Sequence, residues 1–466
     1  MRHQAEDLVM RATLTASALI SALVFSACAN LDITDLNNPG LEQLEGSPTA
    51  SALNTAASGI LIGARGGMSG SVGYVSELGI LGREVFYLSS DDPRFVTELL
   101  IGPLEGGNGA FGGNHWAARY TSIRNTNIVL NAVEKVSGLT TQQKEGIRGF
   151  AKTMQALDLL LIINTRDTFG AAIDVNTDPT AEPGPIVPKA QVFARIVTLL
   201  DEARTHLQNA GATFSFGLSS GFAGFDTPAT FVRFNRALRA RVAVYLGDFA
   251  TANTALQQSF LDVAASLTLG VYHPYSTGAG DVTNGSFDPT GRALRGHPSF
   301  VANAQRKADG SPDNRTTKNE KASNVLTVQG LSSDQLVTVY NSASAPIPII
   351  RNEELILLRA ETQLGLSNIA AAIADINVIR TRAGGLAPYA GAQTATAVLD
   401  EIVYNRRYSL YFEGHRWIDL RRLNRLASLP RDAATHKVFT AFPFPADECL
   451  ARTPQPSSGC SPVTGQ

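Results

Sequence analysis

The chain lacks any large excess of charge of one sign. Its 39 Lys and Arg face 41 Asp and Glu, which leaves a formal net charge of −2. Proteins that bind nucleic acid carry a basic footprint, so this balance predicts no nucleic-acid partner. Lysine is scarce, and most of the positive charge is arginine within helical patterns, which favours exposed faces and ion pairs. Hydrophobic residues make up 44% of the 466 residues, enough for one large domain or two ordinary ones.

Histidine and cysteine are too few and too scattered for a recognisable metal site. The seven His stand at positions 3, 115, 206, 273, 297, 415 and 436, without the H-E-x-x-H spacing of a zinc enzyme. The segment DVTNGSFD offers Asp281, Asn284 and Asp288 as oxygen ligands, but it lacks the regular ligand spacing of a calcium-binding loop. A turn is the favoured interpretation, and a loose calcium site remains an alternative. We therefore predict neither a metal nor a cofactor.

Long apolar runs are absent except near the N-terminus. Residues 12–25 form an uncharged apolar run that has the length of a cleaved export signal and is short for a membrane span. Small residues then precede Cys28, as at a lipoprotein cleavage site where the cysteine is acylated. This predicts a signal peptide over residues 1–27 and a lipidated tether over residues 28–45, anchored by more than one acyl chain. Two acidic residues among the first nine suit a signal poorly, so we expect translation to start at Met10.

The other two cysteines lie in the C-terminal tail. With Cys28 assigned to lipid, Cys449 and Cys460 remain as a pair in a Pro- and Ser-rich segment. Disulfides persist in exported proteins, and no His or further Cys lies near enough to favour a metal site. We predict a disulfide between Cys449 and Cys460 that closes a short loop.

Helical periodicity dominates the rest of the chain. Apolar residues recur at helical spacing over residues 115–136, 141–165, 189–208, 228–246, a segment starting at about Ala250, 346–365 and 366–385. Residues 269–337 show weak periodicity and many Gly, Pro, Ser, Thr, Asn and Asp. This composition predicts a long insertion of loops, where functional residues are often found.

Two turns share one form, LGDFATA at residues 246–252 and LGLSNIA at residues 364–370. Each places Leu-Gly between one helix and a second that opens with small residues, and the first closely resembles the turn of a tetratricopeptide repeat. Helical hairpins of this kind bury their apolar faces only when several stack in a row. The predicted fold is therefore all-α, a tetratricopeptide-like helical superhelix with long loop insertions.

The motifs that could carry catalysis have stronger structural interpretations. GLSSG at residues 217–221 fits G-x-S-x-G, but loop sequence follows it where a nucleophile elbow needs a helix. Asp91-Asp92 could serve a glycosidase, although adjacent acids before Pro favour a turn. In NRRYSLYFEGHRWIDLRRLNRL, residues 405–426, Glu413 or Asp419 could act with His415 as acid or base. Many Arg and few acids favour instead a salt-bridged network that locks the last helices to the body, so we predict no enzyme.

The same segment resembles the C-terminal signature of the SusD/RagB lipoproteins. The signature positions, which we expect to be structural, are Glu413, Gly414, Arg416, Trp417, Asp419 and Arg422. Residues 349–361, 375–384 and 442–448 are similar to neighbouring family motifs, and Tyr120, Asn127 and Phe169-Gly170 also fit. The resemblance covers about residues 28–448 and is most specific near the C-terminus.

The resemblance implies a surface-exposed lipoprotein of the outer membrane that captures oligosaccharides, or sometimes peptides, for a TonB-dependent SusC-like transporter. It implies a binding protein without catalysis. One SusD-like domain is expected over residues 46–466, with a first half at 46–268, the insertion at 269–337, the motif region at 338–448 and a tail at 449–466. The alternatives are a tetratricopeptide-type scaffold that binds only protein and an exported glycoside hydrolase.

Aromatic residues limit the kind of sugar site to expect. Sugar-binding proteins stack apolar sugar faces on exposed aromatic rings, and the chain has only two Trp, one of them within the signature. The remaining candidates for ligand contact, in loop-rich regions where the family tends to bind, are Trp116, Tyr87, Tyr272, Tyr275 and Phe287. This small supply makes a large starch platform unexpected and keeps peptide or another glycan open as ligand.

Overall fold

The computed structural model of the protein describes residues 41–466. The predicted signal peptide, the Met10 start, the acylated Cys28 and most of the tether lie outside these residues. Within residues 41–466, no helix combines the length and the apolar content that a membrane crossing requires.

Long helices make up most of the regular structure. Their bounds are α2 Leu41–Glu45, α3 Ala50–Arg65, α4 Tyr74–Leu81, α5 Arg94–Val96, α6 Ala117–Lys135, α7 Thr141–Arg166, α8 Lys189–Asn209, α9 Pro228–Leu246, α10 Phe249–Gln257, α11 Ser299–Ala302, α12 Asn352–Gly365, α13 Ile369–Arg382, α14 Ala395–Ser409, α15 Arg416–Arg422 and α16 Ala446–Leu450. The predicted helices at 115–136, 141–165, 189–208 and 228–246 are confirmed with ends that shift by at most two residues.

Helix ends follow the capping chemistry of the sequence. Thr140 and Gln143 form a reciprocal capping box before α7, and Thr227 and Thr230 form another before α9. Pro228 opens α9, where a residue without a backbone N–H costs nothing. These local signals explain why the sequence predicts the helix starts well.

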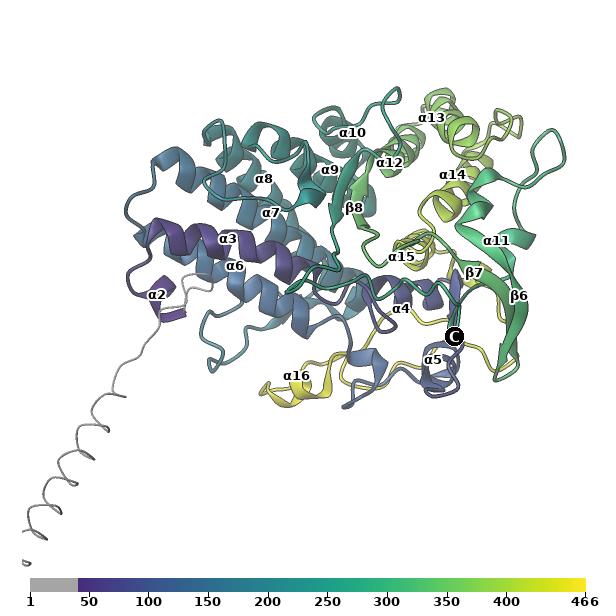
Figure 1. The fold of residues 1–466 in the computed structure, drawn as a ribbon, viewed down its shortest axis with the longest axis horizontal. Helices are drawn as coiled ribbons and strands as arrows, with labels where there is room; N and C mark the ends of the chain where they lie inside the picture. Colours follow the sequence, from purple (N-terminus) through teal and green to yellow (C-terminus); the bar gives the residue numbers. More distant parts are fainter. Residues whose placement is uncertain (1–40) are drawn as a thin grey trace, which may run out of the picture.

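The helices pack in an order that follows the chain. α6 packs on α7, α7 on α8, α8 on α9 and α9 on α10, and α10 then contacts α12, which packs on α13 and α14. Figure 1 shows α3 and α6–α9 side by side, with α10, α12 and α13 continuing toward the other end of the molecule. The chain therefore has a helix-rich scaffold built largely from sequential neighbours.

The two Leu-Gly turns touch each other. A Cβ added to Gly365 would lie 2.1 Å from the ring of Phe249, so only glycine fits where the second turn meets the first. Phe249 follows the first turn directly and begins α10, and α10 contacts α12. The aromatic residue of one turn thus packs on the glycine of the other, a contact that joins the two helix pairs.

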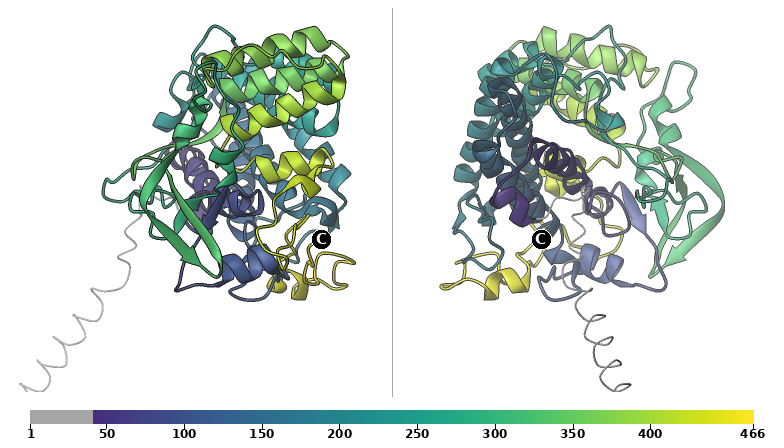
Figure 2. Two further views of the ribbon diagram at one scale, coloured as in Figure 1. Left: turned by 90° about the vertical axis from the view of Figure 1, so that its right-hand side faces the viewer. Right: turned by 60° about the vertical axis from the view of Figure 1, so that its left-hand side comes forward.

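Three antiparallel sheets correct the all-α prediction. Their strands are β1 Val85–Tyr87, β2 Ala171–Ala172, β3 Ile186–Val187, β4 Gly270–His273, β5 Leu294–Gly296, β6 Asn319–Val328, β7 Leu331–Val337 and β8 Ile347–Arg351. The largest sheet has the order β1-β5-β7-β6, β2 pairs with β3, and β4 pairs with β8. Figures 1 and 2 show β6 and β7 on the opposite side of the molecule from α6–α8.

The region expected to be loops, residues 269–337, contains β4–β7 instead. Most of β6 is exposed or half-buried, so its side chains carry little of the apolar alternation that predicts a strand. Backbone pairing with β7 holds it, and Gln329 and Gly330 at the hairpin tip both have positive φ, 50° and 80°. Ile347–Arg351, expected to be helical, is strand β8, because it pairs with β4 before α12 begins.

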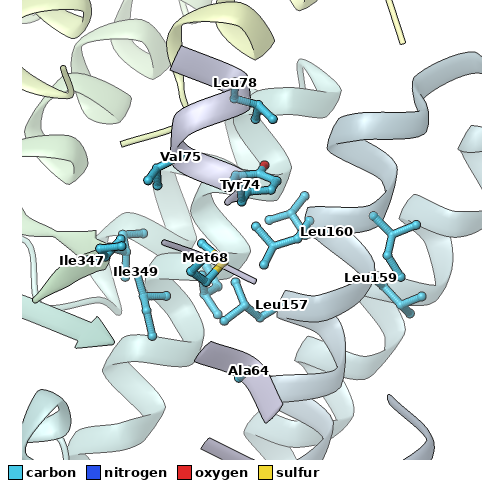
Figure 3. Close-up of a cluster of buried hydrophobic side chains, with 14 of the residues drawn as sticks. Ala64, Met68, Tyr74, Val75, Leu78, Leu157, Leu159, Leu160, Ile347 and Ile349 are labelled. Atoms are coloured by element: carbon cyan, nitrogen blue, oxygen red, sulfur yellow. The ribbon is translucent and has the colours of Figure 1, made fainter. Parts of the chain in front are cut away.

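The main hydrophobic cluster draws on the whole described length, from Leu44 to Cys449. Figure 3 shows one part of it, where Met68, Tyr74 and Leu78 meet Leu157 and Leu160 of α7 and Ile347 and Ile349 of β8. Side chains that are distant in sequence share this core, so the N-terminal helices, the scaffold and the C-terminal third are packed together.

Candidate functional site

The signature segment forms a break between two helices. α14 ends at Ser409, and α15 begins at Arg416. Gly414 in the connecting turn has φ 80°, and a Cβ there would lie 2.9 Å from Tyr74 Cε1. Both the backbone conformation and the lack of space therefore require glycine at position 414.

Buried ion pairs surround this turn. Arg351 Nη2 donates to Glu413 Oε1 at 2.8 Å, Arg406 Nε donates to Asp419 Oδ2 at 2.7 Å, and Arg422 Nη2 donates to Glu361 Oε2 at 2.7 Å. Burial opposes ionisation of Asp419, but Arg406 and Arg422 outweigh it and lower its pKa to about 2. Arg416 Nε donates to Gly82 O at 2.9 Å. Glu413 and Asp419 are thus bound to guanidinium groups.

Trp417 anchors the same segment in the core. It has no exposed surface, and its Nε1 donates to Phe439 O at 2.8 Å. Phe442 meets its ring edge-on with centroids 5.8 Å apart, and the Arg421 guanidinium lies 4.4 Å from the ring centroid. His415 is also buried, and burial lowers its pKa below the usual range. The segment has the geometry of a structural network.

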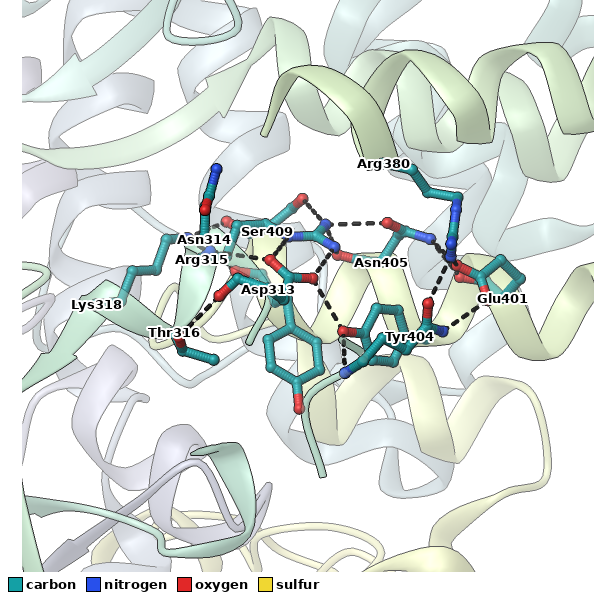
Figure 4. A network of polar contacts seen from close by, with 12 residues as sticks. Asp313, Asn314, Arg315, Thr316, Lys318, Arg380, Glu401, Tyr404, Asn405 and Ser409 are labelled. Carbon is teal, nitrogen blue, oxygen red and sulfur yellow. Dashed lines mark hydrogen bonds and ion pairs between the residues drawn. The ribbon is translucent and has the colours of Figure 1, made fainter. Parts of the chain in front are cut away.

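A second polar network, which the sequence did not reveal, ties residues 305–318 to α13 and α14 (Figure 4). Arg315 Nη2 pairs with Asp313 Oδ2 at 2.6 Å, while its Nη1 donates to Asn405 Oδ1 and Ser409 Oγ, both at 3.0 Å. Tyr404 OH donates to Asp313 Oδ2 at 2.9 Å. The insertion is therefore held to the scaffold through buried charges.

One surface cleft lies between the loop after α3, residues 66–74, and residues 113–119 at the start of α6. We call it the His115 cleft; its volume is about 260 Å³. His115 has φ 61°, and its Nε2 lies 2.7 Å from Glu77 Oε2. A positive φ at a non-glycine residue is uncommon and often marks a functional position.

Buried carboxylates hold polar side chains that line the His115 cleft. Asn114 Nδ2 donates to Glu77 Oε1 at 2.7 Å, and Glu77 is fully buried. Burial raises the pKa of the Glu77 carboxyl, although His115 acts in the opposite direction. Arg119 Nη1 donates to Asp158 Oδ1 at 2.8 Å and to Ala64 O at 2.7 Å. The side chains that line the cleft are therefore held in fixed positions.

Trp116 lines this cleft, but only 4% of its surface is exposed. Its ring packs on Tyr120 and Phe444 at centroid distances of 4.5 and 5.1 Å, and Arg166 lies 5.3 Å from its centroid. Most of the ring thus serves packing, and only a small part of Trp116 is open to contact with a ligand.

The other four aromatic candidates are dispersed. Tyr87 packs on Phe95 at 4.3 Å, and the Tyr272 hydroxyl donates to Thr268 O. Tyr275 is buried beneath Arg65, and Phe287 is half-buried in the following loop. Within residues 41–466, none of the five predicted rings packs against another of the five. The structure therefore does not gather them into one aromatic surface.

A second cleft lies between α6, residues 172–184 and the tail. We call it the Arg452 cleft; its volume is about 470 Å³. Arg452 Nε donates to Glu448 Oε1 at 2.9 Å, and its Nη1 donates to Gly184 O. Arg124 Nε donates to Asn176 O at 3.2 Å on the opposite wall. Sequence reasoning did not single out this cleft, because its walls come together only in the fold.

Cys449 and Cys460 form a disulfide next to this cleft, with Cα atoms 5.8 Å apart. The bridge closes a loop that includes Arg452, which lines the cleft. It therefore restrains one wall of the Arg452 cleft.

The acidic segments considered for metal or catalysis make local contacts. Asp281 pairs with Arg65, Asn284 Nδ2 donates to Ala345 O at 2.8 Å, and Asp288 accepts from backbone N–H groups. Asp92 pairs with Arg94 at 2.7 Å. In the part of the chain that the structure describes, no group of three or more His, Cys, Asp or Glu is arranged to hold a metal ion. The turn interpretation fits both segments.

Comparison with known proteins gives one family and one fold. Residues 277–455 match the model of the SusD family. No curated protein matches the chain. A SusD superfamily protein from Bacteroides vulgatus superposes with a TM-score of 0.66 at 15% identity, over 87% of this chain and 97% of that chain.

Two further solved structures have the same fold. A SusD-like carbohydrate-binding protein from Bacteroides fragilis superposes with a TM-score of 0.63 at 16% identity, over 91% of this chain and 95% of its own. A laminarin-binding SusD-like protein gives 0.59 at 17% identity, over 85% and 97%. The shared architecture extends well beyond the segment that matches the family model.

Proposed function

The chain belongs to the SusD family, and from this premise we propose that it captures oligosaccharides, or peptides, at the cell surface and delivers them to a TonB-dependent SusC-like transporter. The observation that carries the proposal is the SusD fold over most of the chain together with the family match at residues 277–455. Two similar structures are described as carbohydrate-binding and laminarin-binding proteins, which favours a glycan as the first ligand class to test.

The proposal includes the finer features that the sequence predicts. The helix pairs act as a tetratricopeptide-like scaffold, and acylation at Cys28 anchors the protein in the outer membrane. The buried pairing of Glu413 with Arg351 supports a binding role over catalysis, because this carboxylate is held by a guanidinium away from solvent.

Within this function, the His115 cleft is our first candidate for the ligand site. It combines part of the Trp116 surface with the polar side chains of Asn114, His115 and Arg119. Apolar surface beside fixed polar groups suits a sugar, which presents both kinds of surface. Tyr87, Tyr272, Tyr275 and Phe287 remain candidates for additional contacts.

The test separates the two clefts by filling each in turn. Ala118 lines the His115 cleft and is exposed, and Ala181 lines the Arg452 cleft, so Arg at either position blocks one cleft while leaving the core intact. We expect titration calorimetry with laminarin oligosaccharides, followed by a glycan and peptide array, to detect a ligand. Ala118→Arg should abolish its binding, and Ala181→Arg should leave it unchanged.

Loss of binding in Ala181→Arg alone would move the site to the Arg452 cleft. If none of the glycans or peptides binds, the result would favour the alternative of a scaffold that binds only protein. Oligosaccharide turnover that Glu413→Gln removes would favour the hydrolase. Transport coupling has its own test: the protein purified from its native outer membrane should carry acyl chains on Cys28 and bring a TonB-dependent barrel with it.

A further inference from the structure

A third pocket, at the surface of α8, α9 and α10, has a different chemistry from the two clefts. We call it the Arg204 pocket; its volume is about 350 Å³. Its polar lining includes Asp201, Arg204, Arg236, Arg239, Thr251 and Gln258. It shares no lining residue with the His115 cleft or the Arg452 cleft. An inference about it therefore stands independently of the proposed function.

Positive charge exceeds negative charge in this pocket. Three guanidinium groups, from Arg204, Arg236 and Arg239, face the single carboxylate of Asp201, which leaves a net charge of +2. The Asp201 side chain is 48% exposed, so water screens the charge that it contributes. Asp248 does not line the pocket; it accepts from Thr251 N at 3.1 Å and so caps α10.

Arg236 already has protein partners. Its Nη1 donates to Asp201 Oδ1 at 2.8 Å, its Nε donates to Asn235 Oδ1 at 2.8 Å, and its Nη2 donates to Leu200 O. Burial lowers the pKa of Arg236, and the like charges of Arg204 and Arg239 lower it further, against the effect of Asp201. Arg236 thus holds Asp201 in place, and the positive charges of Arg204 and Arg239 lie close to Arg236.

Arg239 and Arg204 lack comparable partners. Arg239 is 8% exposed, and its single hydrogen bond within residues 41–466 is a long one, from Nε to Asp201 Oδ2 at 3.4 Å. Its buried Nη1 has no partner. Arg204 is half-buried and makes no hydrogen bond or ion pair with any described residue. Buried donors are normally satisfied, so the unpartnered Arg239 Nη1 indicates a missing acceptor, and the half-buried Arg204 lies in the same pocket with its guanidinium free.

We propose that the Arg204 pocket binds an oxyanion, either phosphate or sulfate, free or as a monoester on a sugar. Arg presents planar pairs of N–H donors that match the oxygens of such groups. Arg239 and Arg204 supply the free donors, Arg236 sets the shape of the site through Asp201, and Thr251 and Gln258 offer neutral polar groups at the rim. An oxyanion in the pocket offsets the excess of positive charge.

The test measures oxyanion binding by the full-length protein in detergent. Titration calorimetry with inorganic phosphate and sulfate should give saturable binding with a Kd of about 1 mM or below. Arg204→Gln removes one free guanidinium from the half-buried rim and should weaken binding by about tenfold or more, since hydrogen bonds to charged groups are the strong ones. Arg195→Gln is the matched control, because it makes the same change on α8 outside the pocket and should bind like the unmodified protein.

Two further ligands identify the source of the oxyanion. If glucose 6-phosphate binds more tightly than inorganic phosphate and glucose does not bind at the pocket, the site recognises a phosphate carried by a sugar. Inorganic phosphate that binds as tightly as the monoester assigns it to the free ion. The proposal is overturned if neither phosphate nor sulfate saturates the protein, or if Arg195→Gln weakens binding as much as Arg204→Gln.

Discussion

The signature segment and the Arg204 pocket are both rich in arginine, yet they use it differently. In and around the signature segment, residues 405–426, Arg351, Arg406 and Arg422 each pair with a buried carboxylate. The Arg204 pocket has three arginines and one half-exposed carboxylate, Asp201, which pairs with Arg236 and, at 3.4 Å, with Arg239, while Arg204 has no partner among the described residues. Arginine content alone therefore says little about function, whereas the presence or absence of an acceptor separates scaffold from binding surface.

Trp417→Ala in the signature segment should cause the largest loss of stability. The substitution removes a fully buried indole and the hydrogen bond to Phe439 O, so it should lower the free energy of unfolding by about 3–5 kcal/mol. Chemical denaturation of the purified variant, or its folding yield if it cannot be purified, measures the loss. A variant of unchanged stability that no longer binds ligand would show that the scaffold interpretation is wrong.

Glu413→Ala should cause the second-largest loss of stability. It leaves Arg351 buried without one of its carboxylates, although Glu353 still pairs with it. Removing one partner of a buried pair costs about 3–5 kcal/mol, and the remaining acid places this case near 3 kcal/mol. The same denaturation experiment tests it, with Glu134→Ala as the control, because the Glu134 side chain is 65% exposed in its pair with Arg148. Equal losses in the two variants would contradict the distinction between buried and exposed pairs.

Protonation of His415 in the signature segment should cause a smaller loss of stability, which appears as the pH is lowered. Burial lowers the pKa of His415 below its ordinary value near 6.5, so the unfolded state binds more protons as the pH falls. Stability is complete above about pH 6.5 and falls below it, by at most about 1.4 kcal/mol per pH unit for this group. His273, whose pKa burial lowers to about 3, acts in the same direction.

The measurement is urea denaturation at pH 7.5 and at pH 5.5. His415→Gln should lose less stability between these two pH values than the unmodified protein loses. An identical loss in both would mean that His415 becomes protonated without cost in the fold.

Arg204→Gln should have the smallest effect on stability. Arg204 has no acceptor among the described residues and lies near two like charges, so its removal should change the free energy of unfolding by about 0.5 kcal/mol or less. Any change should be a gain at low salt, where repulsion is least screened. Thermal unfolding in low and high salt checks this, and a loss of several kcal/mol would place Arg204 in the scaffold instead.

Local sequence signals account for the parts of the fold that were predicted well. The capping residues before α7 and α9, the apolar stripes along the helices and the glycine at position 414 act over a few residues, so the chain reveals them directly. The strands were missed for the converse reason. β6 is largely exposed and depends on pairing with β7, and its Gln-Gly turn lacks the Asn-Gly or Asp-Gly signal of a tight hairpin.

The candidate sites were less predictable than the fold. Trp116 reads as a loop aromatic in the sequence, but Tyr120, Phe444 and Arg166 enclose it in the structure. Arg204 and Arg239 lie on separate helices, and nothing in their spacing indicates that they share a pocket with one acid. Exposure and pairing depend on residues that are far away in the chain.

The sequence by itself determined the helices, their breaks and the family signature, because capping, periodicity and glycine conformation are local properties of the backbone. Only the tertiary structure decided which charges are neutralised. Glu361 reaches Arg422 and Glu413 reaches Arg351 through packing of distant segments, while the helices around Arg204 bring no second carboxylate to that pocket. Burial and charge pairing are sums over neighbours in space, and it is the fold that assembles those neighbours.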